Sequence, residues 1–385
     1  MIVINEIDAV SRLYHSTLYF CLYLFKTYIM KKLLYLFLTV FIVGCSGEDS
    51  NDGDNNDGDN NQSSCNGDNP VYLADNGVTI KACDFANVGD TGVVNGVTYT
   101  VVDDAMLREM VANGEDVTKI ATTMVTDMSE LIILSYDEQS QAVIFNQPIG
   151  NWDVSGVTTM FRMFVFANNF NQPIRDWDVS NVADMSEMFA VASVFNQPIG
   201  DWDVSSVTNM QMMFEAAGDF NQPIGDWDVS NVTNMAKMFY AYYSNPSSFN
   251  QDISNWDVSN VTDMREMFVA AGDFNQPIGD WDVSNVTDMR GMFLSSPFNQ
   301  PIGGWNVSNV TDMREMFVTA GDFNQPIGDW DVSNVTTMEY MFSYATSFNR
   351  DLSTWSVDSV IECYFFSNGA TSWTQPQPNF TNCTP

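Results

Sequence analysis

The sequence is poor in histidine and in basic residues. Its one histidine is His15, and 14 lysine and arginine residues stand against 49 aspartate and glutamate residues, which gives a formal net charge of −35. We expect His15 to be absent from the mature protein, so the working chain has no imidazole. This excludes Ser-His-Asp and Cys-His nucleophile systems, His-ligated zinc and the commonest general base. A chain of this charge also repels phosphate backbones, so we expect no nucleic-acid partner.

Long apolar runs are also scarce, and the clearest one lies near the N-terminus. "MKKLLYLFLTVFIVGCSGEDS" starts at Met30 with two lysines after the methionine, continues with apolar residues and ends in Ile-Val-Gly-Cys. This order is typical of a signal peptide. We therefore predict that residues 1–29 are an upstream extension and residues 30–44 a signal peptide. The alternative is a transmembrane helix, but lysines interrupt the run and the part after Lys32 is too short to span a membrane.

The Ile-Val-Gly-Cys ending resembles the lipobox of bacterial lipoproteins, whose cysteine becomes the lipidated N-terminus. The resemblance implies lipidation of Cys45, export, and an outer-membrane lipid anchor, at the cell surface, as the only membrane contact. Residues 45–70 are acidic and repetitive, which predicts a disordered tether. Their DGDNNDGDN pattern is similar to a calcium loop, but an EF-hand loop starting at Asp52 needs glycine where the sequence has Asp57, so a spacer is favoured.

Cysteines are few, and their positions suggest disulfides. Two of the six, Cys21 and Cys45, fall in the N-terminal region already described. The other four are Cys65, Cys83, Cys363 and Cys383. An even number in an exported chain predicts disulfides, and the shortest loops pair the first two and the last two. Unpaired cysteines are the alternative.

The segment that follows the tether reads as a small β-rich domain. In residues 71–118, "VYLADNGVTIKAC" and "TGVVNGVTYTVVD" predict two hairpins that turn at Asn-Gly. A short helix follows, capped by Asp103 or Asp104 and stopped at Asn113-Gly114. Residues 119–144 contain "VTDMSEL", which matches the later "VTDMREM", and we predict a degenerate capping repeat.

Nine repeats of about 25 residues occupy residues 145–372, which leaves residues 373–385 as a C-terminal cap. Each repeat begins with a phenylalanine, and the spacings between these are 25 residues apart from one of 29 and one of 24. The phenylalanines are Phe145, Phe170, Phe195, Phe220, Phe249, Phe274, Phe298, Phe323 and Phe348. Such a period predicts a stacked repeat protein, because a single coil cannot bury enough apolar surface to fold alone.

Within one repeat, residues 249–273, the apolar spacing changes at Thr262. Before Thr262 the spacing is irregular, and after it apolar residues follow at i, i+3 and i+4. We predict an extended arm followed by a short helix with Thr262 at its N-cap and Asp263 in its first turn. Eight apolar side chains should form the core: Phe249, Ile253, Trp256, Val258, Val261, Met264, Met267 and Phe268.

The sequence motif of the repeats resembles that of the BspA-like leucine-rich-repeat surface lipoproteins of bacteria of the Bacteroidota type. That family's units read roughly "L-x-x-L-x-L-S-x-F-D-T-S-x-V-T-x-M-x-x-M-F", and here Trp-Asp-Val-Ser-Asn-Val-Thr-Asp-Met occupies the second half. The resemblance, over residues 125–372, implies an α/β fold: a right-handed, leucine-rich-repeat-like solenoid of short parallel strands and short helices. It also implies a surface location and, as in some members, adhesion. Pro148 and its equivalents depart from the pattern and should narrow the sheet.

Three repeated features could be mistaken for sites. The methionine ladder is expected to be core rather than a copper site, and the Asn-Val-Ser and Asn-Val-Thr triplets are expected to serve turns rather than carry glycans. Aspartates follow the tryptophan in six consecutive repeats, and either each caps its own turn or cations such as calcium lie between them. These weak metal candidates are Asp153, Asp178, Asp203, Asp228, Asp257 and Asp282. Otherwise we expect no cofactor.

Catalysis needs one unlike place where groups converge, and nearly every repeat offers the same residues. We therefore predict a protein that is not an enzyme: a cell-surface lipoprotein whose repeats bind host or neighbouring-cell surface proteins or glycans. One alternative is a carbohydrate-active enzyme on a repetitive scaffold, since paired carboxylates serve glycosidases. The other is a structural spacer without a ligand.

Overall fold

The computed structural model describes residues 65, 67–137, 142–244 and 246–385. The chain divides into two units, Met1–Asn60 and Asn61–Pro385, and the described residues all belong to the second. The predicted upstream extension, the signal peptide, the lipidation site Cys45 and most of the tether lie outside the described residues.

The N-terminal part of this unit contains most of its regular secondary structure. Strands β1 (Val71–Leu73) and β2 (Ile80–Ala82) form an antiparallel hairpin. Strands β3 (Thr91–Val94) and β4 (Val97–Asp103) form a second hairpin, and β5 (Ile120–Met124) pairs in parallel with β4. The two predicted hairpins are therefore present, and the second turns at Asn-Gly as expected.

One helix and one small hairpin complete this part. Helix α2 (Asp104–Asn113) begins at the N-cap Asp103, whose side chain accepts the Met106 N–H, and ends at Gly114 with φ 71°. The 3₁₀ helix η1 (Ile132–Ser135) leads into the hairpin of β6 (Tyr136–Asp137) and β7 (Ala142–Val143). The predicted helix and both of its predicted caps are confirmed.

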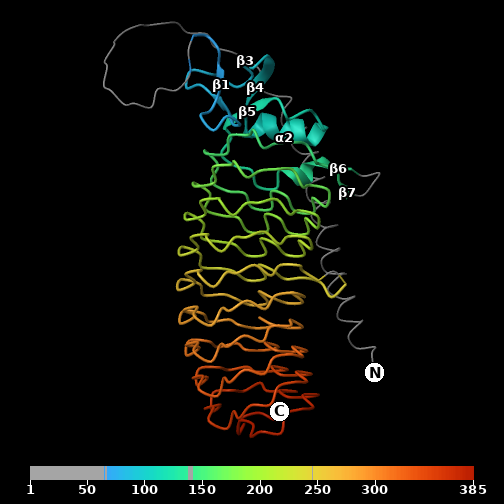
Figure 1. Cartoon of the computed structure of the whole chain (residues 1–385), viewed down its shortest axis with the longest axis vertical. Helices are drawn as coiled ribbons and strands as arrows, with labels where there is room; N and C mark the ends of the chain where they lie inside the picture. Colours follow the sequence, from blue (N-terminus) through green and yellow to red (C-terminus); the bar gives the residue numbers. More distant parts are fainter. Residues whose placement is uncertain (1–64, 66, 138–141, 245) are drawn as a thin grey trace, which may run out of the picture. The chain divides into compact units, whose positions relative to one another are not determined.

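The repeats stack one upon another as coils (Figure 1). One residue per coil, seven places after the tryptophan, forms a parallel bridge to its equivalent in the next coil. These bridges run without a break from Asp127 to Glu362. The tandem repeat prediction is confirmed, and the half-repeat before residue 145 joins the same series.

The predicted helix in each repeat is wrong. In the described residues beyond β7, the chain consists of turns and single bridges, with no α-helix or longer strand. In the fifth repeat, Met264 and Glu266 donate their N–H groups to the next coil, to Asp288 and Arg290, at 3.1 and 2.7 Å.

Phe268 and Ala270 also donate to the next coil, and from Met267 on the N–H groups that alternate with these donors bond within their own coil. Met267, Val269 and Ala271 each donate to the carbonyl three residues back, at 3.3–3.4 Å. In residues 264–271, therefore, N–H groups that bond to the next coil alternate with N–H groups that close tight turns. Met-x-x-Met-Phe spacing buries the same side chains in either arrangement, so the i, i+3, i+4 pattern does not distinguish a helix from these turns.

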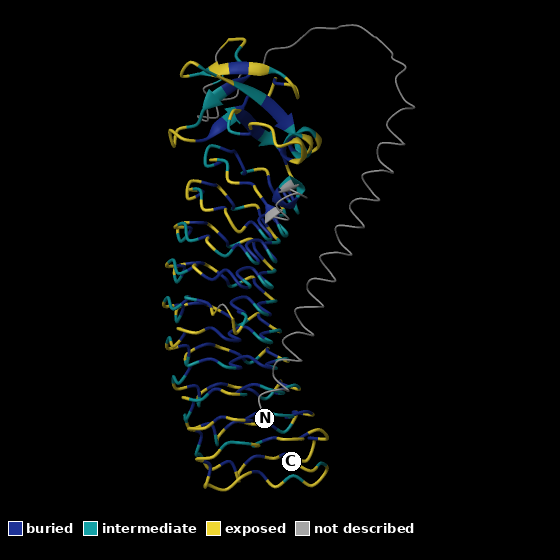
Figure 2. Cartoon of the chain, turned by 90° about the vertical axis from the view of Figure 1, so that its right-hand side faces the viewer, coloured by how far each residue is buried: buried dark blue, intermediate teal, exposed yellow. Residues whose placement is uncertain are grey.

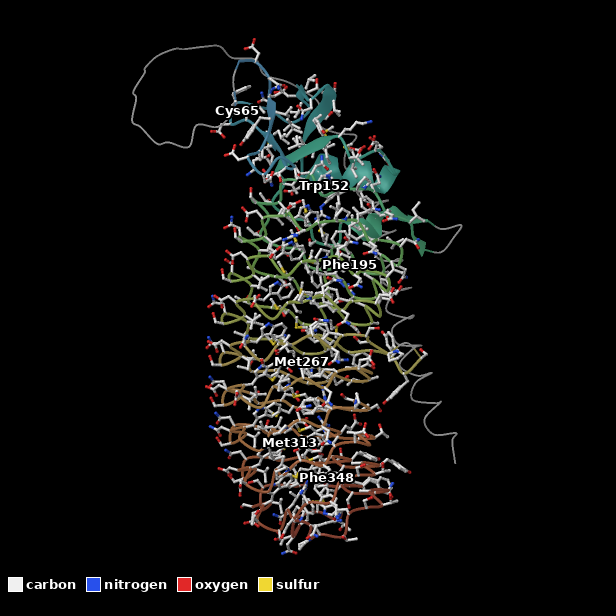
Figure 3. All side chains as sticks on the ribbon, in the orientation of Figure 1. Cys65, Trp152, Phe195, Met267, Met313 and Phe348 are labelled. Carbon is white, nitrogen blue, oxygen red and sulfur yellow. A yellow bond between two sulfur atoms is a disulfide. The ribbon has the colours of Figure 1, made fainter. Side chains whose placement is uncertain are left out.

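The core is the interior of the stack, as Figure 2 shows by the dark blue inner sides of the coils. All eight apolar residues predicted for the fifth repeat are at most 3% exposed. Trp281 stacks on Trp256 with ring centroids 6.4 Å apart and planes within 5°. Its indole Nε1–H donates to the Ile253 carbonyl of the preceding coil at 3.1 Å, so the buried polar atom is satisfied. Figure 3 shows labelled members of this core along the stack, such as Phe195, Met267 and Phe348.

Both predicted disulfides are present, Cys65–Cys83 and Cys363–Cys383. The first joins the start of the described chain to the end of β2, and the second joins the last repeat to the C-terminal segment. In that segment Trp373 packs edge-on against Phe348, with ring centroids 4.7 Å apart. The C-terminal residues thus cover part of the last coil.

Candidate functional site

The aspartates that follow the tryptophans cap turns within their own coils. Asp178 Oδ1 accepts the N–H and the hydroxyl of Ser180 at 3.2 and 2.6 Å. The serine N–H donates to the aspartate Oδ1 in the other five candidates as well, and the serine hydroxyl also donates to Asp153, Asp203 and Asp228. Hydrogen bonds from serine lower the pKa of Asp228 and of Asp282. The geometry therefore supports turn capping for the set of Asp153, Asp178, Asp203, Asp228, Asp257 and Asp282.

The cation alternative finds no preformed site in the described part of the chain. Nowhere in it do three or more His, Cys, Asp or Glu side chains gather closely enough to hold a metal ion. A cation could still associate loosely with the acidic surface. If it does, EDTA or high salt should lower the melting temperature.

The asparagines four places after the tryptophans hold neighbouring coils together. We call them the Asn row: Asn181, Asn231, Asn260, Asn285, Asn309 and Asn334. Each donates its Nδ2–H to a serine carbonyl of the preceding coil at 2.6–2.8 Å. The asparagines of the Asn-Val-Thr triplets thus bond to the preceding coil rather than within a turn, whereas Asn306 of the Asn-Val-Ser triplet accepts the Ser308 N–H within its own turn. The asparagine side chains are exposed, and each Oδ1 is available as an acceptor.

A second exposed row lies two residues further along each coil. We call it the Thr row: Thr158, Thr208, Thr233, Thr262, Thr287, Thr311 and Thr336. Each Oγ1–H donates to the carbonyl of the equivalent residue in the preceding coil at 3.1–3.4 Å. Ala183 interrupts the row in the second repeat, and from Thr208 to Thr336 the same hydroxyl recurs in every coil with the same hydrogen bond. The sequence-based predictions do not include this row, although a Val-Thr pair stands at this position in seven of the nine repeats and could have indicated it.

A further polar ladder lies at the start of each repeat. Asn250 Oδ1 accepts the Asn275 N–H at 3.1 Å and the Gln276 side-chain amide at 2.8 Å. The same arrangement links the equivalent asparagines from Asn146 to Asn349. We call this set the Asn ladder. It replaces backbone pairing next to the prolines, which have no N–H to donate.

One aspartate departs from the pattern. Asp153 is only 2% exposed and lies 3.5 Å from the Lys81 ammonium of β2. Its equivalents in the next five repeats are exposed. Asp153 is therefore the one buried member of the six candidate aspartates, and it lies in the first repeat.

Comparison with known families identifies the repeats. Four tandem stretches, residues 103–200, 133–245, 241–301 and 286–381, match the family described as "Mycoplasma protein of unknown function, DUF285". The chain belongs to the DUF285 family. No curated protein and no solved structure matches it.

The family assignment overturns the resemblance to BspA-like leucine-rich-repeat lipoproteins, because the matches to DUF285 cover residues 103–381. The shared Asp-x-Ser-x-Val-Thr-x-Met words encode an Asp-Ser turn and buried Val and Met side chains. Such motifs specify the local geometry of a coil, so chains of different families can share them. No helix in the described part of this DUF285 chain has the length and hydrophobicity needed to cross a membrane.

Proposed function

We propose that this DUF285 protein is an exported, non-enzymatic scaffold whose coils form one solenoid. In this proposal the chain is anchored through a lipid on Cys45, and it binds surface proteins or glycans of a host or of neighbouring cells. The observation that best supports this function is the Thr row, in which the same exposed hydroxyl recurs in register over successive coils. Repeated identical contacts raise avidity without requiring a strong single contact.

The exposed chemistry of this face consists mainly of acceptors. Each threonine hydroxyl proton and one of the two amide protons of each Asn-row side chain already bond to backbone carbonyls, so the oxygen lone pairs outnumber the remaining donors. The aspartates add negative charge beside them. A partner that supplies many donors, such as the hydroxyls of a glycan or the amides and basic side chains of a protein, suits this surface.

The proposal is tested by binding of the full chain to immobilised matrix proteins, glycans and whole cells. A variant with Thr233→Lys, Thr262→Lys and Thr287→Lys should lose most of the binding, because three consecutive contacts of one row are replaced. The matched control carries Gln222→Lys, Gln251→Lys and Gln276→Lys, with the same change of charge at the Asn ladder of the same three coils.

Three outcomes would contradict the proposal. Equal loss in both triple variants would indicate a general charge effect. Release of reducing sugar ends from a glycan would favour the carbohydrate-active enzyme. Absence of binding to every surface, with or without calcium, would favour the spacer.

A further inference from the structure

A pocket of about 210 Å³ lies where the β1–β2 hairpin meets the first two repeats. The hairpin is held to the first repeat by a hydrogen bond from the Ile80 N–H to the Asn151 carbonyl at 2.9 Å. The lining residues are Ala74, Asn76, Thr79, Lys81, Trp152, Asp153, Val154, Asp176 and Asp178. Asn76, Asp176 and Asp178 are exposed, whereas Trp152, Asp153 and Val154 are buried. The pocket therefore has an exposed acidic rim and a buried base.

Asp153, one of the buried residues that line the pocket, has a carboxylate oxygen without a hydrogen-bond partner. Asp153 Oδ1 accepts the N–H and hydroxyl of Ser155 and lies 3.5 Å from the Lys81 Nζ. Asp153 Oδ2 is buried and has no hydrogen-bond partner in the described structure. A buried, unpaired carboxylate oxygen is costly, so the fold leaves an acceptor that a bound donor would satisfy.

The charge of the lining selects the kind of donor. The three carboxylates of Asp153, Asp176 and Asp178 face one ammonium group, that of Lys81, so the lining is net negative. Carboxylates accept hydrogen bonds but do not donate them. A group with several N–H donors, no acceptor and a positive charge complements such a lining.

We propose that this pocket binds the side chain of an arginine from a partner protein. A guanidinium carries five N–H donors in a planar fork that matches carboxylates. Ala74, Trp152 and Val154 supply apolar lining, which suits the methylene stem behind the charged head. The volume is below the roughly 300–1,000 Å³ of pockets for drug-sized ligands, as a single side chain requires.

This site is separate from the Thr row and adds specificity at one end of the array. Multivalent rows bind without choosing where a partner begins, whereas one distinct pocket sets a register. Its test is independent of the proposed function, because it measures a small probe at one pocket rather than adhesion to a surface.

To test this proposal, the full chain is titrated with ethylguanidinium, ethylammonium, glucosamine and glucose, and binding is measured by calorimetry or by NMR. We expect saturable binding of ethylguanidinium, weaker binding of ethylammonium and none of glucose. Asp153→Asn should weaken ethylguanidinium binding by about tenfold, because it removes a charge-assisted hydrogen bond. The matched control Asp203→Asn, at the equivalent exposed position two repeats on, should leave binding unchanged.

A second variant should change the affinity for ethylguanidinium in the opposite direction. Lys81→Met removes the resident cation and should tighten ethylguanidinium binding, which a merely structural role of Asp153 would not produce. Thermal unfolding of each variant shows whether it is folded, and Asp178→Asn at the rim replaces Asp153→Asn if the latter does not fold. The proposal is overturned if ethylguanidinium does not saturate, if Asp203→Asn weakens binding as much as Asp153→Asn, or if glucosamine or glucose binds more tightly.

Discussion

Two positions in most repeats adopt a left-handed backbone conformation. In the fifth repeat they are Glu266 with φ 56° and Ala270 with φ 48°. Residues with a Cβ pay roughly 1–2 kcal/mol for this conformation. It is tolerated because it turns alternate N–H groups toward the next coil, as the bond from Ala270 to Leu294 at 2.9 Å illustrates. Gly369, with φ 75°, occupies the position of Ala270 in the last repeat.

Two neighbouring alanines test this strain. Ala270→Gly should leave stability unchanged or raise it, because relief of about 1–2 kcal/mol of strain exceeds the added entropy of the unfolded chain. Ala271→Gly should lower stability by about 0.4–1 kcal/mol, because Ala271 does not have a positive φ. Urea unfolding of both variants measures the difference. Equal losses would show that the left-handed position carries no strain.

Glu215 should make stability depend on pH. Burial raises its pKa from 4.5 to about 7, with smaller effects from Lys237, which lowers the pKa, and from Glu187 and Glu266, which raise it. The folded state therefore holds a proton that the unfolded state has released between these values. The contribution of Glu215 to stability should be greatest below pH 4.5, fall as the pH rises to about 7, and level off above.

The size of this effect is on the order of 1–3 kcal/mol, and the lower part of that range is expected because Glu215 keeps some contact with solvent. Glu215→Gln should abolish the fall. Melting temperatures at pH 5 and pH 8 measure it in both proteins. An unchanged slope in the variant would assign the pH dependence to other groups.

At the scale of the element, a coil depends on its neighbours for many of its backbone bonds. Besides the turns, each coil contributes one member of the Asn ladder and one indole N–H to the coil before it. In a three-turn helix the backbone N–H groups would bond to carbonyls of the same coil, and the backbone hydrogen bonds between coils would not form. Turns are favoured in the stack because they allow each coil to form more backbone hydrogen bonds with both of its neighbours.

The Asn ladder yields a prediction at this scale. Asn299 Oδ1 accepts the Asn324 N–H and the Gln325 amide, both at 2.9 Å. Asn299→Ala should cost about 1–2 kcal/mol, because it leaves a half-buried N–H without its acceptor. Asn299→Asp keeps an oxygen at the same place and should cost less. Chemical denaturation compares the two, and a loss as large for aspartate as for alanine would rule out the acceptor role.

At the scale of the whole molecule, the two ends of the stack are closed by different means. At the N-terminal end, Arg108 of α2 donates to the carbonyls of Asp127 and Ser129, at 3.1 and 2.8 Å, and so pairs the first open edge. At the C-terminal end, the disulfide Cys363–Cys383 holds the final segment against the last repeat. Each device acts on its own end, since coils contact only their neighbours.

Loss of the C-terminal disulfide should therefore fray one end only. Replacing Cys363 and Cys383 by serine should cost about 3 kcal/mol for a loop of this length. Amide hydrogen exchange should quicken in the last repeats and stay unchanged in the first ones. The matched double variant of Cys65 and Cys83 should produce the reverse distribution. Uniform loss of protection along the chain would show that the stack unfolds as one cooperative body.

The sequence by itself determined the repeat, the buried residues of each coil and the pairing of the cysteines. It could do so because a 25-residue period, apolar side chains such as Trp256 and Phe268, and short loops between cysteines are properties of the chain alone. It also determined the short helix α2, whose caps Asp103 and Gly114 are local signals. The helices predicted after Thr262 failed, because the partners of those N–H groups belong to the next coil.

Only the tertiary structure decided which of the equal positions differ. Asp153 and Asp203 have nearly identical neighbours in the sequence, yet the β1–β2 hairpin buries the first and leaves the second exposed to solvent. Likewise, the Thr row becomes one continuous surface only when the coils are stacked in register. The reason is that burial and alignment arise from segments distant in sequence, and a repeated motif carries no information about its neighbours at the ends of the array.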